Sequence, residues 1–274
     1  MTLVLTLREA PGARVDAAAL RPDALAGLTV EAIRRLAITV GRRPAAVGDL
    51  FAVSGDGGPD MRVEGDLRRV DRLGEGMADG RLELDGPAGD HVGARMSGGT
   101  IVARGDVGAY AGAELRGGLL HVRGDAGEGL AAAYPGTRAG MRGGEVLVEG
   151  NAGDEAGAGM RRGLVAVGGA VGAGAGLRML AGTLIALGGF GPEAGICLRR
   201  GTLVSAGAVE IPSTYAFACR YRPPALRLQL LRLAELGLGV DERLLHATWS
   251  RWSGDRLELA RGEILVLEDD GRRR

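Results

Sequence analysis

The chain of 274 residues contains no lysine, so all 34 of its basic residues are arginines. This absence excludes mechanisms that depend on a lysine amine, such as a phosphate-binding loop ending in Gly-Lys, a Schiff base or a lysine general base. The 34 acidic residues balance the basic ones, and the formal net charge is zero. Without net charge the chain has no overall attraction to nucleic acid or to an anionic membrane, and we expect neither as a partner.

Cysteine and long apolar runs are also scarce. Cys197 and Cys219 are too few for a disulfide framework and lack the spacing of a zinc or iron–sulfur site. No apolar run reaches the roughly 18 residues of a membrane span, and the N-terminus lacks the pattern of a signal peptide, which favours a cytoplasmic protein. The three histidines, His91, His121 and His246, share no ligand spacing. We therefore predict no metal site and no catalytic residue, and we expect His121 at the surface.

Glycine, in contrast, is abundant, with 50 residues, and much of it belongs to a repeat. Seven copies carry an aliphatic anchor residue, and five of the six steps between anchors are 19 residues long. The anchors are Met77, Met96, Leu115, Met141, Met160, Met179 and Leu198. A glycine follows each anchor by three positions: Gly80, Gly99, Gly118, Gly144, Gly163, Gly182 and Gly201. A fixed period of this length is typical of a solenoid in which each repeat forms one turn.

A strand is predicted after each of these glycines, because apolar residues alternate there at period two, as in Ile101 and Ala103. Corners of the form Gly-x-x-Gly follow, and we expect glycine to supply the positive φ of a tight turn. With a third glycine before most anchors, three short strands per turn are predicted. The fold class is thus all-β: a right-handed parallel β-helix of about seven 19-residue coils. Valine at Gly144 or Gly163 should destabilise it more than valine at Gly129.

The two ends of such a coil expose unpaired backbone groups and need caps. Residues 1–64 are predicted to form a small α/β N-terminal cap, with a strand at 3–7 and a helix at about 30–36 that Thr29 begins. Residues 65–209 form the β-helix domain. Residues 210–274 form the C-terminal cap, with a helix at about 225–236 after two prolines and strands near 248–252 and 256–267.

One step of the repeat is irregular. Leu115 and Met141 are 26 residues apart, seven more than the usual period, and we place the extra length in residues 130–138. An insertion in one coil must bulge from the stack. It either forms a binding surface or is a surface loop without a role, and Tyr134 and Pro135 at its tip favour a contact.

The outward positions of the strands change character along the chain. They are charged in the early repeats and apolar in the late ones, as at Leu164, Ile185 and Val204. An apolar outer face is not left to water. Its cover is either the C-terminal helix of the same chain, through leucines such as Leu226 and Leu230, or a partner protein.

Arginine recurs directly after the anchor in three consecutive repeats, at Arg116, Arg142 and Arg161, with Arg162 beside the last. Stacked like charges repel one another unless acids or a bound anion neutralise them. Two interpretations remain open: a solvated edge paired with Glu114, Glu145 or Asp154, or a row of cations that binds an extended polyanion.

The repeat Gly-x-x-x-Gly-x-x-Met-x-x-Gly-x-Ile-x-Val-x-Gly, seen at residues 89–105 and 153–169, resembles the C-terminal β-helix domain of the glutamate synthase large subunit. It is even more similar to the C subunit of formylmethanofuran dehydrogenase. The flanks favour the latter: Leu-Thr-Leu-Arg-Glu-Ala-Pro at 5–11, Val-Gly-Asp-Leu-Phe-x-Val-Ser-Gly at 47–55 and Cys-Arg-Tyr-Arg-Pro-Pro at 219–224.

The resemblance implies that the chain is part of a heteromeric enzyme that handles formyl groups on methanofuran. The parent complex is either a molybdenum or tungsten dehydrogenase or a formyltransferase/hydrolase complex that takes formyl groups from tetrahydromethanopterin and releases formate. The C subunit is non-catalytic in both, and no tightly bound cofactor is expected in this chain. Because such cofactors carry glutamate tails, Arg116, Arg142, Arg161 and Arg162 are candidates for binding the polyglutamate tail of methanofuran. The alternatives are a glutamate-synthase-type structural domain and an unrelated β-helix enzyme.

Overall fold

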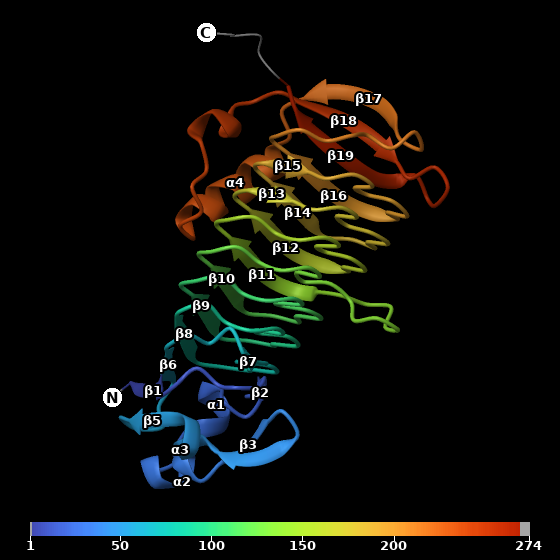
Figure 1. The fold of residues 1–274 in the computed structure, drawn as a ribbon. Helices are drawn as coiled ribbons and strands as arrows, with labels where there is room; N and C mark the ends of the chain where they lie inside the picture. The colour runs from blue at the N-terminus through green and yellow to red at the C-terminus, as the bar shows by residue number, and fades with distance from the viewer. Residues whose placement is uncertain (1, 269–274) are drawn as a thin grey trace.

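The computed structural model describes residues 2–268 and consists mostly of β-strands with few helices, which confirms the all-β class (Figure 1). One sheet of 13 strands runs through the molecule in the order β17-β18-β19-β16-β14-β12-β11-β10-β9-β8-β6-β1-β5. Its repeat strands are β6 (Asp60–Glu64), β8 (Arg81–Asp85), β9 (Thr100–Ala103), β10 (Leu119–Val122), β11 (Arg142–Val148), β12 (Arg162–Val167), β14 (Thr183–Ala186) and β16 (Arg200–Ser205). Each of the first seven pairs in parallel with the strand of the next repeat.

The alternation predicted from the sequence sets the register of this sheet. Leu82 pairs with Ile101, and Ile101 pairs with Leu120, so that equivalent residues of successive repeats stack. All seven anchors and the inward residues of every repeat strand are fully buried. The interior is therefore a column of aliphatic side chains.

The prediction of three strands per turn was wrong. On a second side of each turn, successive repeats are joined by single β-bridges, such as those from Ala88 to Val107 and from Val107 to Ala126. Paired strands form on this side only at β13 (Ala170–Val171) and β15 (Gly189–Phe190) among the described residues. The third side of each turn consists of hydrogen-bonded turns: the backbone N–H of Arg95 donates to the carbonyl oxygen of Ala113 in the next repeat. Three residues on this side adopt positive φ in most repeats, as His91 (φ 64°), Gly93 (φ 63°) and Arg95 (φ 57°) do, and such backbone does not extend into a strand.

At the N-terminal end, β1 (Leu3–Leu7) pairs in parallel with β6 and antiparallel with β5 (Phe51–Ser54). A small second sheet contains β2 (Val15–Asp16), β3 (Ala37–Val40), β4 (Arg43–Ala46) and β7 (Val70–Asp71). Three short helices accompany it: α1 (Pro22–Leu25), α2 (Val30–Arg34) and α3 (Val47–Leu50). The predicted strand at 3–7 and the predicted helix cap are confirmed, since the Thr29 hydroxyl accepts the N–H of Ala32 at 3.2 Å.

At the C-terminal end, β19 (Arg261–Leu267) adds in parallel to β16, and β18 (Trp249–Gly254) and β17 (Ala216–Tyr221) follow antiparallel. The strand β17 was missed from the sequence. The helix α4 (Pro224–Glu235) matches its prediction closely, and the short 3-10 helix η1 (Glu242–Leu245) follows it. In Figure 1, α4 lies along the outer side of the late repeat strands.

The question of what covers the apolar outer face is thus answered by the chain itself. Leu226, Leu230 and Leu233 of α4 pack in one buried cluster with outward residues of four repeat strands. Those outward residues are Leu147, Leu164, Ala166, Ile185 and Val204. The helix is also tied by polar contacts, because Arg232 forms an ion pair with Glu145 at 3.1 Å and Gln229 donates to the hydroxyl of Thr183 at 3.0 Å.

Candidate functional site: a basic row and an arginine-rich cavity

Three of the four predicted site residues, Arg116, Arg142 and Arg161, occupy equivalent positions in successive repeats, as the sequence predicts. The N–H of Arg116 bonds to Met96, that of Arg142 to Leu115 and that of Arg161 to Met141, so each arginine occupies the same place one coil further along. Arg162 begins β12 and pairs in the sheet with Arg142. All four residues are exposed. Within residues 2–268, none of them has a carboxylate within ion-pair distance.

The acids considered as partners for this row are engaged elsewhere. Glu145 pairs with Arg232 of α4, and the Asp154 carboxylate accepts the backbone N–H of Ala173 at 2.7 Å. Glu114 pairs with Arg95 at 3.1 Å. Burial tends to raise the pKa of Glu114, but the Thr137 hydroxyl and the Arg95 guanidinium outweigh burial and hold the pKa below its usual range. The row therefore keeps its positive charge largely uncompensated by neighbouring side chains.

The insertion lies next to this row, and its limits differ from the prediction. Residues Leu130 to Ala132 are buried within the regular repeat. The regular hydrogen bonding continues at Met141, whose N–H donates to the carbonyl oxygen of Ala131 as that of Leu115 donates to Gly112. The seven extra residues are therefore 134–140 rather than part of 130–138. The alanines at 131–133 fit the coil because they occupy the places of Gly112, Ala113 and Glu114 in the preceding repeat.

The tip of the insertion folds back onto the stack. The Tyr134 ring lies 5.3 Å from the Tyr110 ring and 5.5 Å from the His91 ring, and its hydroxyl is 3.0 Å from Nδ1 of His91. The guanidinium carbon of Arg95 lies 5.0 Å from the centre of the same ring, a cation–π distance. Burial raises the pKa of Tyr134 to about 12. The contact that this tip was expected to make is thus formed first of all within the chain.

A chain of alternating charges supports the aromatic cluster from one side. Arg72 pairs with Asp16 and Glu75, and Arg95 bridges Glu75 at 3.3 Å and Glu114 at 3.1 Å. Both glutamates are nearly buried. A network of this kind holds Arg95 beneath the tyrosine ring better than an isolated surface pair would.

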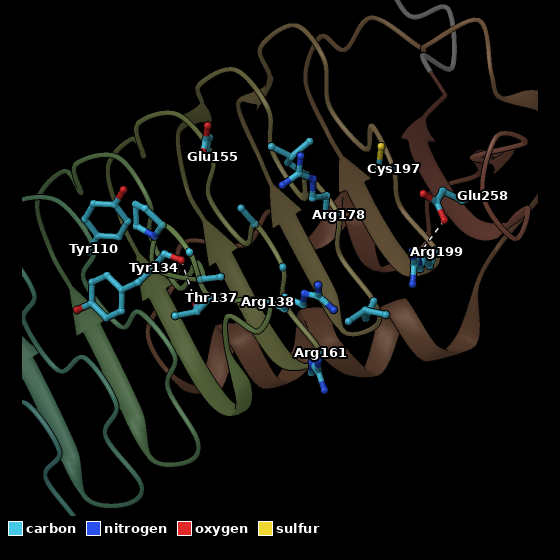
Figure 2. A pocket seen from close by; sticks show the side chains of 17 residues that line it. Tyr110, Tyr134, Thr137, Arg138, Glu155, Arg161, Arg178, Cys197, Arg199 and Glu258 are labelled. Atoms are coloured by element: carbon cyan, nitrogen blue, oxygen red, sulfur yellow. Dashed lines mark hydrogen bonds and ion pairs between the residues drawn. The ribbon is translucent and has the colours of Figure 1, made fainter.

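Between the insertion and the later coils lies a cavity of about 660 Å³ (Figure 2). Tyr110 and Tyr134 stand at one end, and Arg199 and Glu258 stand at the other, joined by an ion pair of 2.9 Å. Arg138, Arg161, Arg178 and Glu155 also line it. This cavity was not predicted from the sequence, in which Tyr134 was the one aromatic residue singled out in the insertion.

The environment of His121 differs from the prediction. His121 is only 7% exposed, and its Nε2 lies 2.9 Å from Glu149, so the expectation of a surface histidine was wrong. The segment after α4 covers it, with Gly237 adjacent to the ring. Over residues 2–268 no group of three or more His, Cys, Asp or Glu side chains is placed to hold a metal ion, and both cysteines are free thiols. In the same residues no helix is long and apolar enough to cross a membrane.

These features define a class of protein: an all-β protein whose successive repeats pair in parallel in one large sheet, with antiparallel strands at both ends of the sheet and exposed arginines on one side. No protein-family model matches the chain. A chain of the formyltransferase/hydrolase complex FhcABCD of Methylorubrum extorquens, crystallised with methylofuran, superposes with a TM-score of 0.91 at 34% identity, over 97% of this chain and 100% of that one.

Curated relatives agree with this match over shorter segments. The C subunit of the same bacterial complex is 41% identical over 61 residues, and the C subunit of tungsten-containing formylmethanofuran dehydrogenase 2 from Methanothermobacter thermautotrophicus is 35% identical over 78 residues. These segments span 23% and 29% of the relatives' own length, and 22% and 27% of this chain. The chain belongs to the family of C subunits of formyltransferase/hydrolase and formylmethanofuran dehydrogenase complexes. The sequence resemblance is thereby confirmed.

Proposed function

We propose that this chain is a non-catalytic structural subunit of a formyltransferase/hydrolase complex that handles formyl groups on a methanofuran-type cofactor. The observation that carries the proposal is the superposition on a chain of the methylofuran-bound bacterial complex over nearly the full length of both chains. Among the described residues no metal-binding cluster is found, and the buried apolar side chains form one cluster along the repeats and a second one under α4.

The proposed architecture is a right-handed parallel β-helix at residues 65–209 between caps at 1–64 and 210–274. The parallel register of one strand per repeat and the stacked bridges of the second side support it. Antiparallel strands cover both ends of the parallel repeat strands, so that β5 and β17 are the edges of the sheet among the described residues. A rod of this kind suits a scaffold, because its sides remain available for other proteins of the complex.

Within this function, the row of Arg116, Arg142, Arg161 and Arg162 is proposed to bind the polyglutamate tail of the cofactor. Equivalent residues of stacked coils lie about 4.8 Å apart. Such a row suits an extended chain of carboxylates better than a compact ligand, and each guanidinium can hold one carboxylate through two hydrogen bonds. The lack of ion pairs along the row, within residues 2–268, supports this proposal.

Copurification tests the structural role. A tagged version of the chain, expressed in its native cell, should copurify with the catalytic subunits of a formyl-transferring complex. The chain purified alone should release no formate from a formylated cofactor. Turnover by the partner-free chain, abolished by a substitution in the repeat, would contradict the non-catalytic role.

Charge reversal tests the row in the assembled complex. The double variant Arg142→Glu/Arg161→Glu should raise the apparent KM for a polyglutamylated cofactor, more at low salt than at high salt, and spare a short-tailed analogue. The matched control reverses two exposed arginines of the N-terminal cap, Arg42→Glu/Arg43→Glu, and should leave both KM values unchanged. Equal effects on both cofactors would instead indicate a protein interface.

A further inference from the structure

The cavity beside the insertion exists because seven extra residues cross the side of the stack. The loop is held by defined contacts: the Thr137 hydroxyl donates to the Tyr134 carbonyl at 2.9 Å, and the N–H of Gly140 bonds to Gly159 at 2.9 Å. Together with the aromatic cluster at Tyr134, these contacts fix the wall of the cavity. A volume of about 660 Å³ is within the range of small-molecule sites.

The charge inside this cavity is unbalanced. Four arginines line it against two glutamates, Glu155 and Glu258. Arg199 is neutralised by Glu258 at 2.9 Å. Arg138, Arg161 and Arg178 have no carboxylate within ion-pair distance among residues 2–268, and neither does Glu155 have a basic partner there. The cavity therefore holds an excess of positive charge that an anionic ligand would neutralise.

The three unpaired arginines are spread along the stack. Arg138 lies in the insertion, where its carbonyl oxygen is near Gly159, whereas Arg161 follows the anchor Met160 and Arg178 precedes the anchor Met179 of the next coil. Figure 2 shows the labelled side chains of Arg138, Arg161 and Arg178 at separate places along the cavity. A single small oxyanion would therefore not contact all three guanidinium groups. The floor between them is apolar, with Ala158, Leu177 and Leu180.

We propose that this cavity binds a small organic dianion whose two oxyanion groups, carboxylates or phosphates, are separated by an uncharged body. The two acidic groups contact arginines at different coils, and the body lies on the apolar floor beside the tyrosines (Figure 2). The site is distinct from the row of arginines: Arg138 and Arg178 belong to the cavity alone, and Arg161 is shared. The proposal does not depend on the structural role in a complex, because the full chain contains every residue of the cavity.

Calorimetric titration of the full chain tests the proposal. The probes are inorganic phosphate, α,ω-alkane dicarboxylates of increasing length from succinate to suberate, and α,ω-alkane bisphosphonates of the same lengths. Affinity should rise with the separation of the acidic groups, exceed that of inorganic phosphate, and fall with added salt. The tighter of the two series identifies the kind of oxyanion that the cavity prefers.

Three variants are expected to change the Kd in opposite directions. Arg138→Gln and Arg178→Gln should each raise the Kd of the best probe at least tenfold, whereas Glu155→Gln should lower it, because it removes a negative charge from the cavity. The control is Arg227→Gln on α4, an exposed arginine outside the cavity, which should leave the Kd unchanged. Equal melting temperatures would show that the substitutions do not act through the fold.

Other outcomes overturn the proposal. Binding of inorganic phosphate as tight as that of the longest probes would mean a single-oxyanion site. Weakening by Arg227→Gln to the same extent as by Arg138→Gln would mean diffuse attraction to a basic surface. Absence of saturable binding by every probe would show that the cavity is not a site for such dianions.

Discussion

At the scale of single residues, glycine serves two separate purposes in the coils. The glycines three positions after each anchor all have positive φ, from 77° at Gly99 to 110° at Gly182, as expected of a turn that other residues avoid. Most corner glycines have ordinary φ, contrary to the prediction. A Cβ at Gly108 would lie 2.8 Å from the backbone of Gly89 in the preceding coil, so close stacking rather than φ excludes a side chain there.

Asparagine and aspartate at the corners join neighbouring repeats through their side chains. Their side chains accept backbone N–H groups from the next coil, as Asp90 does from Ala109 at 2.9 Å and Asp106 from Asp125 at 2.8 Å. Each corner is thereby hydrogen-bonded to its neighbour along the stack. Small residues with acceptor side chains hold the coils together where the second sheet has only single bridges.

Valine at Gly163 should destabilise the protein by a few kcal/mol, because its φ is 104° and a Cβ would lie 2.8 Å from the carbonyl oxygen of Gly144. Urea unfolding measures the loss. Gly129 is not the neutral position that the sequence indicated, since its φ is 68° and a Cβ would lie 2.7 Å from the Tyr110 ring. The suitable control is Gly239→Val, which meets nothing within 4 Å and should cost far less. Equal losses at Gly163 and Gly239 would contradict the close-packed coil.

The raised pKa of Tyr134 predicts a pH dependence at the alkaline end. Burial favours the neutral phenol, so the ring's contribution to stability is complete below pH 10 and is lost as the pH rises through about 12. The ultraviolet phenolate absorbance of the wild-type protein minus that of Tyr134→Phe should titrate near pH 12. A difference spectrum that titrates at pH 10 would mean that the phenol is solvated and that the insertion does not fold onto His91.

At the scale of elements, α4 combines a buried face and an exposed one on the same helix. Leu230 is fully buried against the outer face of the sheet, while Leu228, two residues away, is 66% exposed. The burial of Leu226, Leu230 and Leu233 follows the helical period. This contrast provides an internal comparison for the energy of docking the helix.

Leu230→Ala should lower the free energy of unfolding by about 2–5 kcal/mol, the usual cost of truncating a buried leucine. Leu228→Ala should change it by less than about 0.5 kcal/mol. Chemical denaturation of both variants measures the difference. If both substitutions had the same small effect, the helix would not be the cover of the apolar face, and that face would be open to a partner protein.

A helix or strand is predictable from the sequence when its apolar residues recur at the spacing of that element. The repeat strands and α4 meet this condition, with alternation at period two and leucines at helical spacing, and their burial was predicted residue by residue. The strand β17 does not: five of its six residues are exposed, so no alternation marks it. The arginine row was predictable because it follows the 19-residue period. The cavity was not, because the direction in which Tyr134 folds depends on His91 and Tyr110, more than twenty residues away in the sequence.

At the scale of the whole molecule, one cluster of buried apolar side chains runs without interruption from Leu3 to Ile264. In repeat proteins the stability is approximately the sum of the stability of each repeat and of the interfaces between neighbouring repeats. A continuous core and a single 13-stranded sheet make these interfaces large everywhere. Strong interfaces couple distant coils and favour unfolding in one step.

A destabilising change at one end should therefore be detected at the other. Both tryptophans, Trp249 and Trp252, lie in β18 at the C-terminal end, whereas Leu5 is buried at the N-terminal end between β5 and β6. Leu5→Ala, costing about 2–5 kcal/mol, should lower the urea midpoint of tryptophan fluorescence as much as that of far-ultraviolet circular dichroism. An unchanged fluorescence midpoint, with only the dichroism shifted, would mean that the N-terminal coils unfold on their own and that the stack is not one cooperative unit.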